Sequence, residues 1–277
     1  MVRRSILFSP GDDRKKLRKA VRFDADVVVF DLEDAVVPDA KPAARETVRD
    51  ALADVVPADC EVCVRVNPVG RVAADDVAVA LSGTVPDSVM LPKTGSAEDV
   101  ARLAALLTEA GVDCPVLALV ESAAGVLHAE AIAGHEATDA LVFGAEDLAG
   151  DVGATRTADG GELAYARQHV VLAARAAGVT PVDTHYPNYT DDAGLRDEAE
   201  RAVELGYDGK LAVHPGQVAV LNDVFTPGPE RVAWAERLLD ARDEADGGVF
   251  VVDGEMIDAP QIRQAERVLE RVGVDRG

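Results

Sequence analysis

Eight short apolar runs recur along the chain, and longer stretches with helical periodicity or turn residues separate them. The runs are SILFSP (5–10), DVVVFDLED (26–34), EVCVRVN (61–67), SVMLPK (88–93), PVLALVES (115–122), DALVFGAED (139–147), TPVDTHY (180–186) and GKLAVHP (209–215). Most are rich in Val, Leu and Ile with little polar alternation, which is typical of parallel strands buried on both faces. Two amphipathic segments between them, 99–111 and 162–178, end on glycine as helices often do. Eight strand–helix units in 277 residues predict an α/β fold, a (β/α)8 TIM barrel.

The barrel is expected to occupy residues 1–228, and residues 229–277 are expected to form a C-terminal extension. In that extension, segments 231–245 and 261–272 have helical spacing and flank a strand-like piece, 248–260. A barrel does not need this extension to close. The extension is therefore expected to pack against the barrel, to form a lid, or to reach a neighbouring subunit as an arm. An open doubly wound sheet is the alternative fold, but the first turn, FSPGDD, lacks the G-x-G-x-x-G pattern of its nucleotide site.

The charge balance is strongly acidic, with a net charge of -22 and six lysines against 22 arginines. Such a surface disfavours nucleic acid and anionic membranes as partners. Dispersed acidity with little lysine favours a halophilic host, and an ordinary acidic protein is the alternative. The apolar runs are too short for a transmembrane helix or a signal peptide, so we expect a cytoplasmic protein. Cys60, Cys63 and Cys114 are expected to be free thiols in a reducing compartment.

Polar side chains follow the apolar runs at the points where the predicted strands end. In chain order they are Asp31, Glu33, Asp34, Arg65, Asn67, Lys93, Glu121, Glu146, Asp147, Asp183, His185 and His214. In a (β/α)8 barrel these ends share one face, which is where the active sites of this fold lie. Their convergence therefore predicts a site, with Asp147 at the barrel mouth rather than in open solvent.

The carboxylates of Glu121 and Asp147 offer hard oxygen ligands that, with water and a substrate oxygen, suit Mg²⁺ (or Mn²⁺). Arg65 can clamp a carboxylate or hold a developing enolate. Together these residues favour a metal-dependent aldol or Claisen step. The alternatives stay open: both acids can cap helices, Arg65 can form a structural ion pair, and Lys93 can form a Schiff base.

A basic cluster stands out near the N-terminus of this acidic chain, in PGDDRKKLRKA (10–20). Its charged members are Arg14, Lys15, Lys16, Arg18 and Lys19. Such a cluster beside the barrel mouth suits the phosphate groups of a bulky ligand such as coenzyme A. Solvent-facing helix charge is the competing interpretation.

Several of these stretches resemble the citrate lyase β-subunit-like family of the HpcH/HpaI aldolase superfamily, which includes malyl-CoA, β-methylmalyl-CoA and citramalyl-CoA lyases. The matching motifs, in order, are RRSILFSPGDDRKKLRKA (3–20), DLEDAV (31–36), VRVN (64–67), LPK (91–93), ESAAG (121–125), FGAEDL (143–148), GKLAVHPGQ (209–217) and GEMIDAP (254–260). The resemblance implies a Mg²⁺-dependent barrel lyase that cleaves or forms a C–C bond in an acyl-CoA, with a small 2-oxo acid as the other partner.

The resemblance also assigns roles by position. Glu121 and Asp147 look like the metal ligands, and Arg65 looks like the arginine that holds the oxo acid and the thioester enolate. Asp258 is similar to an acid/base that a neighbouring subunit delivers, which implies a homotrimer or homohexamer. The remaining roles fall to two groups. Pro10, Gly11, Arg14, Lys15, Lys16 and Glu146 look like substrate- or CoA-binding residues, and Asp31, Glu33, Asp34, Lys93 and His214 look like supporting residues.

Malyl-CoA or β-methylmalyl-CoA, giving glyoxylate with acetyl-CoA or propionyl-CoA, is the first substrate assignment from this resemblance. Citramalyl-CoA is the alternative. A citrate lyase β subunit acting on an acyl-carrier-protein thioester is a second functional class, and a CoA-independent aldolase is a third.

Overall fold

The structure of the chain is a computed structural model that describes residues 2–56, 58–244 and 249–274. Its eight parallel strands form a closed barrel in sequence order, which confirms the predicted fold. The strands are β1 (Ser5–Pro10), β2 (Val27–Asp31), β3 (Glu61–Arg65), β4 (Ser88–Leu91), β5 (Val116–Val120), β6 (Thr138–Phe143), β7 (Thr180–Asp183) and β8 (Gly209–Ala212). Closure comes from pairing of β1 with β8, in which Ser5 lies in register with Lys210.

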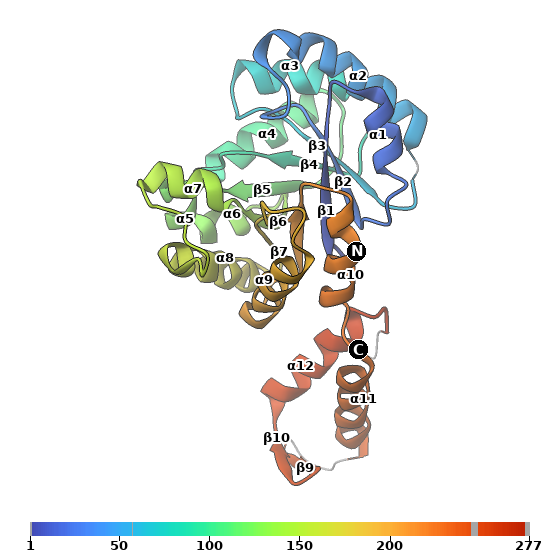
Figure 1. Cartoon of the computed structure of the whole chain (residues 1–277), viewed down its shortest axis with the longest axis vertical. Coiled ribbons are helices and arrows are strands. Elements are labelled where there is room, and N and C mark those ends of the chain that lie inside the picture. The colour runs from blue at the N-terminus through green and yellow to red at the C-terminus, as the bar shows by residue number, and fades with distance from the viewer. Residues whose placement is uncertain (1, 57, 245–248, 275–277) are drawn as a thin grey trace. The chain divides into compact units, whose positions relative to one another are not determined.

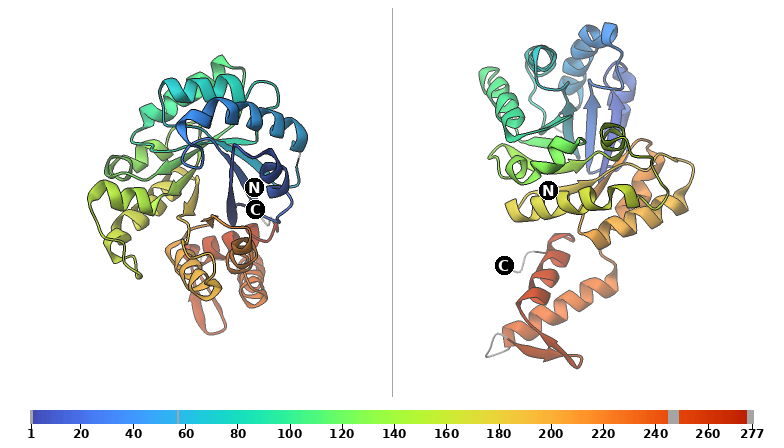
Figure 2. Two further views of the ribbon diagram at one scale, coloured as in Figure 1. Left: turned by 45° about the horizontal axis from the view of Figure 1, so that its top comes forward. Right: turned by 90° about the vertical axis from the view of Figure 1, so that its left-hand side faces the viewer.

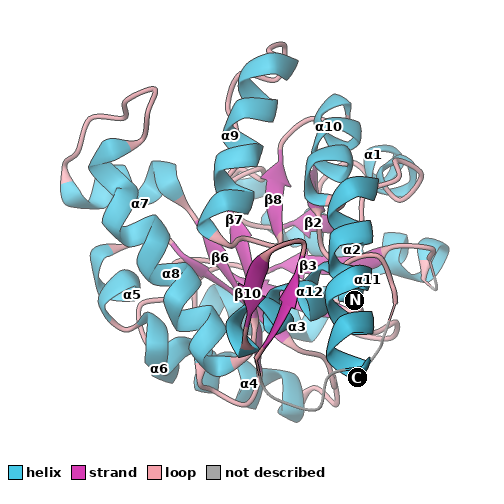
Figure 3. Ribbon diagram, turned by 90° about the horizontal axis from the view of Figure 1, so that it is seen from below, coloured by secondary structure: helices cyan, strands magenta, loops and turns pink. Residues whose placement is uncertain are grey.

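Helices surround these strands on the outside, as Figures 1 and 3 show. They are α1 (Arg14–Ala20), α2 (Lys41–Val55), α3 (Arg71–Ala80), α4 (Ala97–Glu109), α5 (Ala123–Leu127), α6 (Ala129–Ala133), α7 (Ala145–Val152), α8 (Ala164–Ala177), α9 (Asp192–Leu205) and α10 (Gly216–Phe225). Two short 3-10 turns, η1 (Pro38–Ala40) and η2 (Gly161–Leu163), precede α2 and α8. The glycine stop expected after α8 is Gly178, which has a φ of 76°.

The barrel interior is a core of apolar side chains. Its buried members are Ile6, Val27, Val29, Cys63, Met90, Leu117, Leu119, Ala140, Val142, Val182 and Leu211. Alternate residues of each strand fill this interior while their neighbours pack under the outer helices, and this explains the unbroken apolar runs. The three cysteines are free thiols, and burial raises the pKa of Cys63.

One predicted mouth residue belongs instead to the shell between strands and helices. Asp183 is fully buried and accepts hydrogen bonds from Arg167 Nε (2.9 Å) and Nη2 (2.7 Å) and from Lys210 Nζ (2.6 Å). Burial opposes ionisation of Asp183, but these two cations outweigh it and lower its pKa. The Asp183 side chain faces Arg167 of α8, whereas His185 lies beyond the end of β7 and lines the pocket at the mouth.

The C-terminal residues form a compact unit of their own, which comprises residues 223–277, and the barrel unit comprises residues 3–222. Helices α11 (Pro229–Glu244) and α12 (Ala259–Glu270) pack through a small core that includes Leu238, Leu239 and Leu269. Between them in sequence, β9 (Phe250–Val252) and β10 (Glu255–Ile257) form an antiparallel hairpin (Figure 2). The expected strand-like piece is this hairpin, although its first residue, and the last residue of the expected 231–245 helix, lie outside the described residues.

Among the described residues, no helix has both the length and the apolar composition that crossing a membrane requires.

Candidate active site at the carboxyl ends of the barrel strands

A pocket of about 410 Å³ opens at the carboxyl ends of the barrel strands. Its lining joins residues from both ends of the barrel sequence: Phe8, Asp31, Asp34, Ala35, Arg65, Leu119, Glu121, Gly144, Ala145, Glu146, Asp147, Thr184, His185, Leu211 and Val213. Acidic side chains line the part of the pocket formed by residues at and after the ends of β2, β5 and β6. Phe8 of β1, Leu211 of β8 and Val213, just after β8, form an apolar wall. Most of the polar residues that were predicted to converge at the ends of the strands therefore line this pocket.

Arg65 ends β3 and is held by two carboxylates. Its Nε and Nη2 each donate a 2.7 Å hydrogen bond to Asp31, and Nη1 lies 2.8 Å from Glu33 Oε2. The guanidinium also lies 4.9 Å from the ring centroid of Phe8, which is a cation–π distance. Burial alone would lower the pKa of Arg65, but Asp31 and Glu33 more than offset that effect and raise it. Because a guanidinium has five N–H groups, two of them remain for a ligand.

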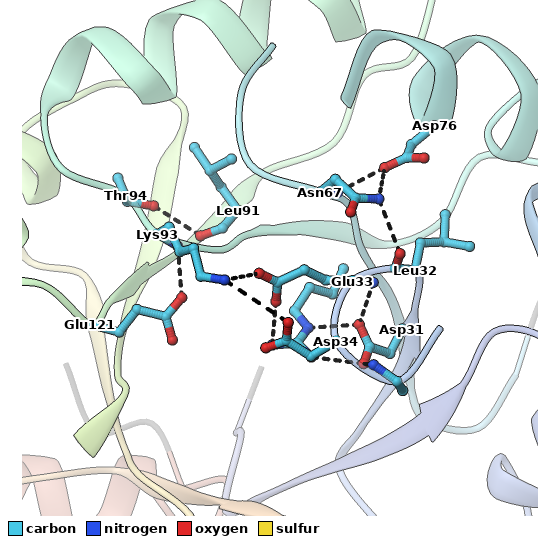
Figure 4. Close-up of polar contacts among 12 residues, drawn as sticks. Asp31, Leu32, Glu33, Asp34, Asn67, Asp76, Leu91, Lys93, Thr94 and Glu121 are labelled. Carbon is cyan, nitrogen blue, oxygen red and sulfur yellow. Dashed lines mark hydrogen bonds and ion pairs between the residues drawn. The ribbon is translucent and has the colours of Figure 1, made fainter. Parts of the chain in front are cut away.

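Lys93 connects the arginine side of the site with Glu121. Its Nζ lies 2.9 Å from Glu33 Oε1 and 3.9 Å from Asp34 Oδ1. Its backbone has a φ of 52°, in the left-handed region that side chains rarely adopt. That conformation directs the Lys93 N–H to Oε1 of Glu121, at 2.7 Å (Figure 4).

Glu121 follows β5 and is 5% exposed. Burial raises the pKa of Glu121 to about 8; the amide of Lys93 opposes the shift, and the nearby charges of Asp147 and Glu33 add to it. Gly144 makes room for this carboxyl group. A Cβ atom at position 144 would lie 2.6 Å from the Glu121 Cβ and 2.7 Å from its Oε2. The ESAAG and FGAEDL motifs are therefore packed against each other at the site.

Asp147 and Glu146 lie in the first turn of α7, after β6 has ended at Phe143. The prediction that they end strand six is therefore wrong by a few residues, and Asp147 both lines the pocket and occupies a favourable helix N-terminus. Glu146 accepts a 2.9 Å hydrogen bond from Arg156. Glu121 does not cap α5, because Ser122 does so by accepting from the Gly125 amide.

A second layer of hydrogen bonds fixes the loop that carries Glu33. Asn67 Nδ2 donates to Leu32 O (3.0 Å) and to Asp76 Oδ2 (2.7 Å), as Figure 4 shows. Lys41 Nζ donates to the carbonyls of Leu32 and Glu33, both at 3.1 Å, and to Asn67 Oδ1. Asn67 therefore supports the site from behind rather than lining the pocket, and Lys41 is a supporting residue that the strand-end argument missed.

His214, expected as a supporting residue, does not line the pocket. It is exposed and its ring lies 5.0 Å from that of Tyr189. The residue just before it, Val213, lines the pocket, since successive residues after a strand alternate in direction. Gln217 supports this turn by accepting the amides of Val213 (2.9 Å) and His214 (3.2 Å).

The basic cluster forms α1, directly after β1 and the Pro10–Gly11 turn. Asp13 begins the helix by accepting the amides of Lys15 and Lys16. Arg14 Nη2 lies 2.7 Å from Asp54 in α2, so part of its charge is matched within the protein. Lys15 and Lys16 are exposed, although Lys16 Nζ lies 3.8 Å from Asp13.

Asp258 lies in the C-terminal unit, where it is exposed and begins α12. Its backbone amide donates to Gln261 Oε1 at 3.1 Å, and the two residues form a reciprocal capping box. The structure thus gives Asp258 a role in starting a helix.

The donor set of the pocket fits a hard divalent cation. Within the described ranges, no group of three or more His, Cys, Asp or Glu side chains is arranged to hold a metal ion. Mg²⁺, however, is commonly bound through one or two carboxylates, with water and substrate completing its shell. Burial raises the pKa of Glu121, and repulsion from Asp147 and Glu33 adds to the shift; a bound cation would offset both effects.

A parallel barrel with paired acids and a clamped arginine at the carboxyl ends of its strands defines a barrel enzyme for chemistry on small anionic substrates. Over residues 4–215 the chain matches the family described as HpcH/HpaI aldolase/citrate lyase, and the chain belongs to this family.

Three similar proteins span nearly the whole chain. The mitochondrial citramalyl-CoA lyase of Rattus norvegicus is 34% identical over 96% of this chain and 85% of its own length. The (3S)-malyl-CoA thioesterase of Cereibacter sphaeroides (strain ATCC 17025) is 36% identical over 97% of this chain and 94% of its own. The structure of CitE from Mycobacterium tuberculosis with magnesium, acetoacetate and coenzyme A is 36% identical, with a TM-score of 0.81 over 98% of both chains. The resemblance noted in the sequence is thereby confirmed at the level of the family.

Proposed function

We propose that this chain is a Mg²⁺-dependent lyase that cleaves, reversibly, a C–C bond in a 3-hydroxyacyl-CoA, with L-malyl-CoA or β-methylmalyl-CoA as the first substrate assignment. The products are glyoxylate and acetyl-CoA or propionyl-CoA. The observation that carries the proposal is the pocket in which the buried carboxyl of Glu121 and the carboxylate of Asp147 lie with Arg65. Coenzyme A and magnesium in the M. tuberculosis relative support it.

In this proposal Glu121 and Asp147 hold Mg²⁺ (or Mn²⁺). The ion, when bound, supplies Lewis-acid polarisation of the oxygen that becomes the oxo group. Arg65 uses its two remaining N–H groups to bind the oxo acid and the thioester oxygen. Asp31 and Glu33 keep the guanidinium in one orientation, and Lys93 neutralises Glu33 so that the site retains an affinity for anions.

The cleavage is a retro-aldol step that passes through a thioester enolate. A base takes the proton of the 3-hydroxyl group, the bond between C2 and C3 of the acyl chain breaks, and its electron pair moves into the thioester as an enolate. Protonation of that enolate carbon gives the shorter acyl-CoA. The apolar wall of Phe8 and Leu211 suits the methylene or methyl-bearing carbon that passes through this enolate.

Two further assignments complete the proposal. Pro10, Gly11, Arg14, Lys15 and Lys16 form a lip that binds the phosphates of CoA, and the exposure of both lysines supports this. Asp258 of a neighbouring subunit serves as the acid/base, which makes the enzyme a homotrimer or homohexamer. Its exposed carboxylate at the start of α12 is available for such a role. Mixed oligomers of Asp258→Asn and Glu121→Gln subunits should regain activity if this holds. No recovery in oligomers shown to be mixed would contradict it.

A second candidate substrate is citramalyl-CoA, which the name of the R. norvegicus relative favours. Hydrolysis of malyl-CoA to malate and free CoA is a further reaction to test, given the name of the C. sphaeroides relative. The experiment offers malyl-, β-methylmalyl- and citramalyl-CoA side by side, with Mg²⁺ and with EDTA, and measures glyoxylate, pyruvate and free thiol. Metal-dependent oxo acid without free thiol supports the lyase. Free thiol without oxo acid, or no turnover of any of the three, would refute it.

A further inference from the structure

One pocket residue has no assigned role in the chemistry above. His185 follows β7 and lines the pocket beside Thr184. In the part of the chain that the structure describes, neither nitrogen of its imidazole ring has a protein partner, whereas Thr184 Oγ1 accepts the amide of Ala145 at 3.1 Å. A half-buried imidazole with unused hydrogen-bonding groups at the edge of a pocket is available to a ligand.

The position of His185 around the barrel indicates which part of a ligand it would meet. The charged lining residues come from the strand ends β2 to β6, where the carboxylate and hydroxyl oxygens of a hydroxy acid find Arg65 and the acids Glu121 and Asp147. The lining beyond His185 comes from β8 and β1 and is apolar, with Leu211 and Phe8. His185 therefore lies between the anion-binding and the apolar parts of the pocket, where a neutral thioester group would lie.

The electrostatic surroundings suit a neutral donor. Burial lowers the pKa of His185, and the nearby charge of Glu146 opposes that shift only in part. An imidazole that stays neutral can donate from one nitrogen to a carbonyl oxygen without placing a second buried cation near Arg65.

We propose that His185 donates a hydrogen bond to the thioester oxygen of the substrate and stabilises the enolate that forms there. The inference rests on the proposed function and adds to it a second donor, opposite Arg65. An N–H aimed at an oxygen that gains negative charge in the transition state typically contributes about 100-fold or more in rate.

The test compares three variants. His185→Leu removes the donor at similar volume, His185→Gln keeps a neutral N–H, and His135→Leu is a matched control. His135 is likewise half-buried, but it lies before β6, at the opposite end of the barrel strands. Circular dichroism and melting curves establish that each variant is folded, and Mg²⁺ binding by calorimetry establishes that the metal site is intact.

His185→Leu should lower kcat about 100-fold with Mg²⁺ affinity and the KM of the oxo acid in the condensation direction unchanged. His185→Gln should recover at least tenfold of that loss, and His135→Leu should behave as the wild type. Solvent deuterium exchange into the methyl group of acetyl-CoA reports the enolate directly, and it should slow in His185→Leu by a factor similar to that for kcat.

The two proposals fail separately. If the wild type cleaves none of the three thioesters, the proposed function is refuted, whatever position 185 contains. If the wild type is active and folded His185→Leu keeps its kcat and its deuterium exchange, the role of His185 is refuted and the lyase proposal stands. A loss in His185→Leu that His185→Gln does not relieve would also refute a donor role.

Discussion

The backbone amide of Lys93 donates a 2.7 Å hydrogen bond to Oε1 of Glu121, and Lys93 makes this bond from a left-handed backbone conformation. The loop after β4 thus holds the carboxyl group after β5 through its main chain, while the Lys93 side chain turns to Glu33. The two functions of position 93 are separable, since one depends on φ and the other on the ammonium group.

Substitutions at position 93 should separate them. Lys93→Gly keeps the backbone conformation at no steric cost, whereas Lys93→Val places a β-branched side chain at a φ that it strongly disfavours. We expect Lys93→Gly to bind Mg²⁺ as the wild type does and Lys93→Val to bind at least tenfold more weakly, as measured by calorimetry. Equal affinities in the two variants would mean that the amide of residue 93 does not orient Glu121.

Lys93 should not form a Schiff base. The hydrogen bond to Glu33 raises the pKa of Lys93, so the amine stays protonated, and therefore not nucleophilic, at any pH below its usual value of 10.5. Incubation with glyoxylate or pyruvate and borohydride should leave the intact mass unchanged, with turnover retained. A reduced adduct that peptide mapping places on Lys93 would establish the lysine mechanism instead.

Glu121 should destabilise the metal-free protein. Its folded pKa of about 8 lies above the usual 4.5, so folding takes up a proton between these values and stability falls as the pH rises through this window. At about 1.4 kcal/mol per pH unit, metal-free Glu121→Gln should be more stable than the wild type by about 3 kcal/mol at pH 7 and by little at pH 4.5.

The measurement is the free energy of unfolding in EDTA at several pH values, with Mg²⁺ binding followed in parallel. Glu121→Gln should lose metal binding and lyase activity while gaining this stability. A variant that is less stable than the wild type at pH 7 in EDTA would show that Glu121 is stabilised by its surroundings rather than strained by them.

Gly144 should be required for the position of Glu121. The methyl group of Gly144→Ala would meet the Cβ and Oε2 atoms of Glu121 below 3 Å, so the carboxyl group must move. We expect Mg²⁺ affinity to fall at least tenfold. Gly150→Ala, in the helix α7 that directly follows Gly144, is the matched control, because its added Cβ has no neighbour within 4 Å. The prediction fails if the two variants bind Mg²⁺ alike.

The lip of α1 should act on binding rather than on turnover. Lys15→Ala/Lys16→Ala should raise the KM for the acyl-CoA several-fold with kcat nearly unchanged, and the effect should shrink as salt screens the contact. Arg102→Ala, which removes an exposed positive charge from a helix ion pair with Glu98, is the control for loss of surface charge away from α1. A KM that stays constant at every salt concentration would leave these lysines as ordinary surface charge.

The barrel and much of its mouth could be predicted from the sequence, because a buried parallel strand leaves an unbroken apolar run and its active-site residues follow that run directly. Asp31, Arg65, Glu121 and Asp147 were found in this way, and all four line the pocket. The direction in which each side chain points is harder to predict from the sequence, because it changes from one residue to the next. His214 and Val213 differ by one position, yet only Val213 lines the pocket.

The sequence did not reveal residues whose role depends on contacts with distant parts of the chain. Gly144 matters because it lacks a side chain opposite Glu121, and the FGAED motif gives no distance between them. Lys41 supports Glu33 from the start of α2, where a lysine resembles any solvent-facing residue of a helix. Asp183 is polar and follows the strand pattern, but its partners Arg167 and Lys210 lie on other elements and were not paired with it in advance.

The pairing of β1 with β8 determines when the barrel can close during synthesis of the chain. Ser5 and Lys210 are register partners, so the free edge of β1 stays uncovered until β8, the eighth strand of the barrel, has been synthesised. Phe8 and Arg65 are synthesised early, whereas Leu211 and Val213, which share their pocket, arrive last. A nascent chain therefore has no complete pocket until residue 213 has emerged. Until then it exposes an uncapped β1 edge, the kind of surface that chaperones bind and that aggregation begins from.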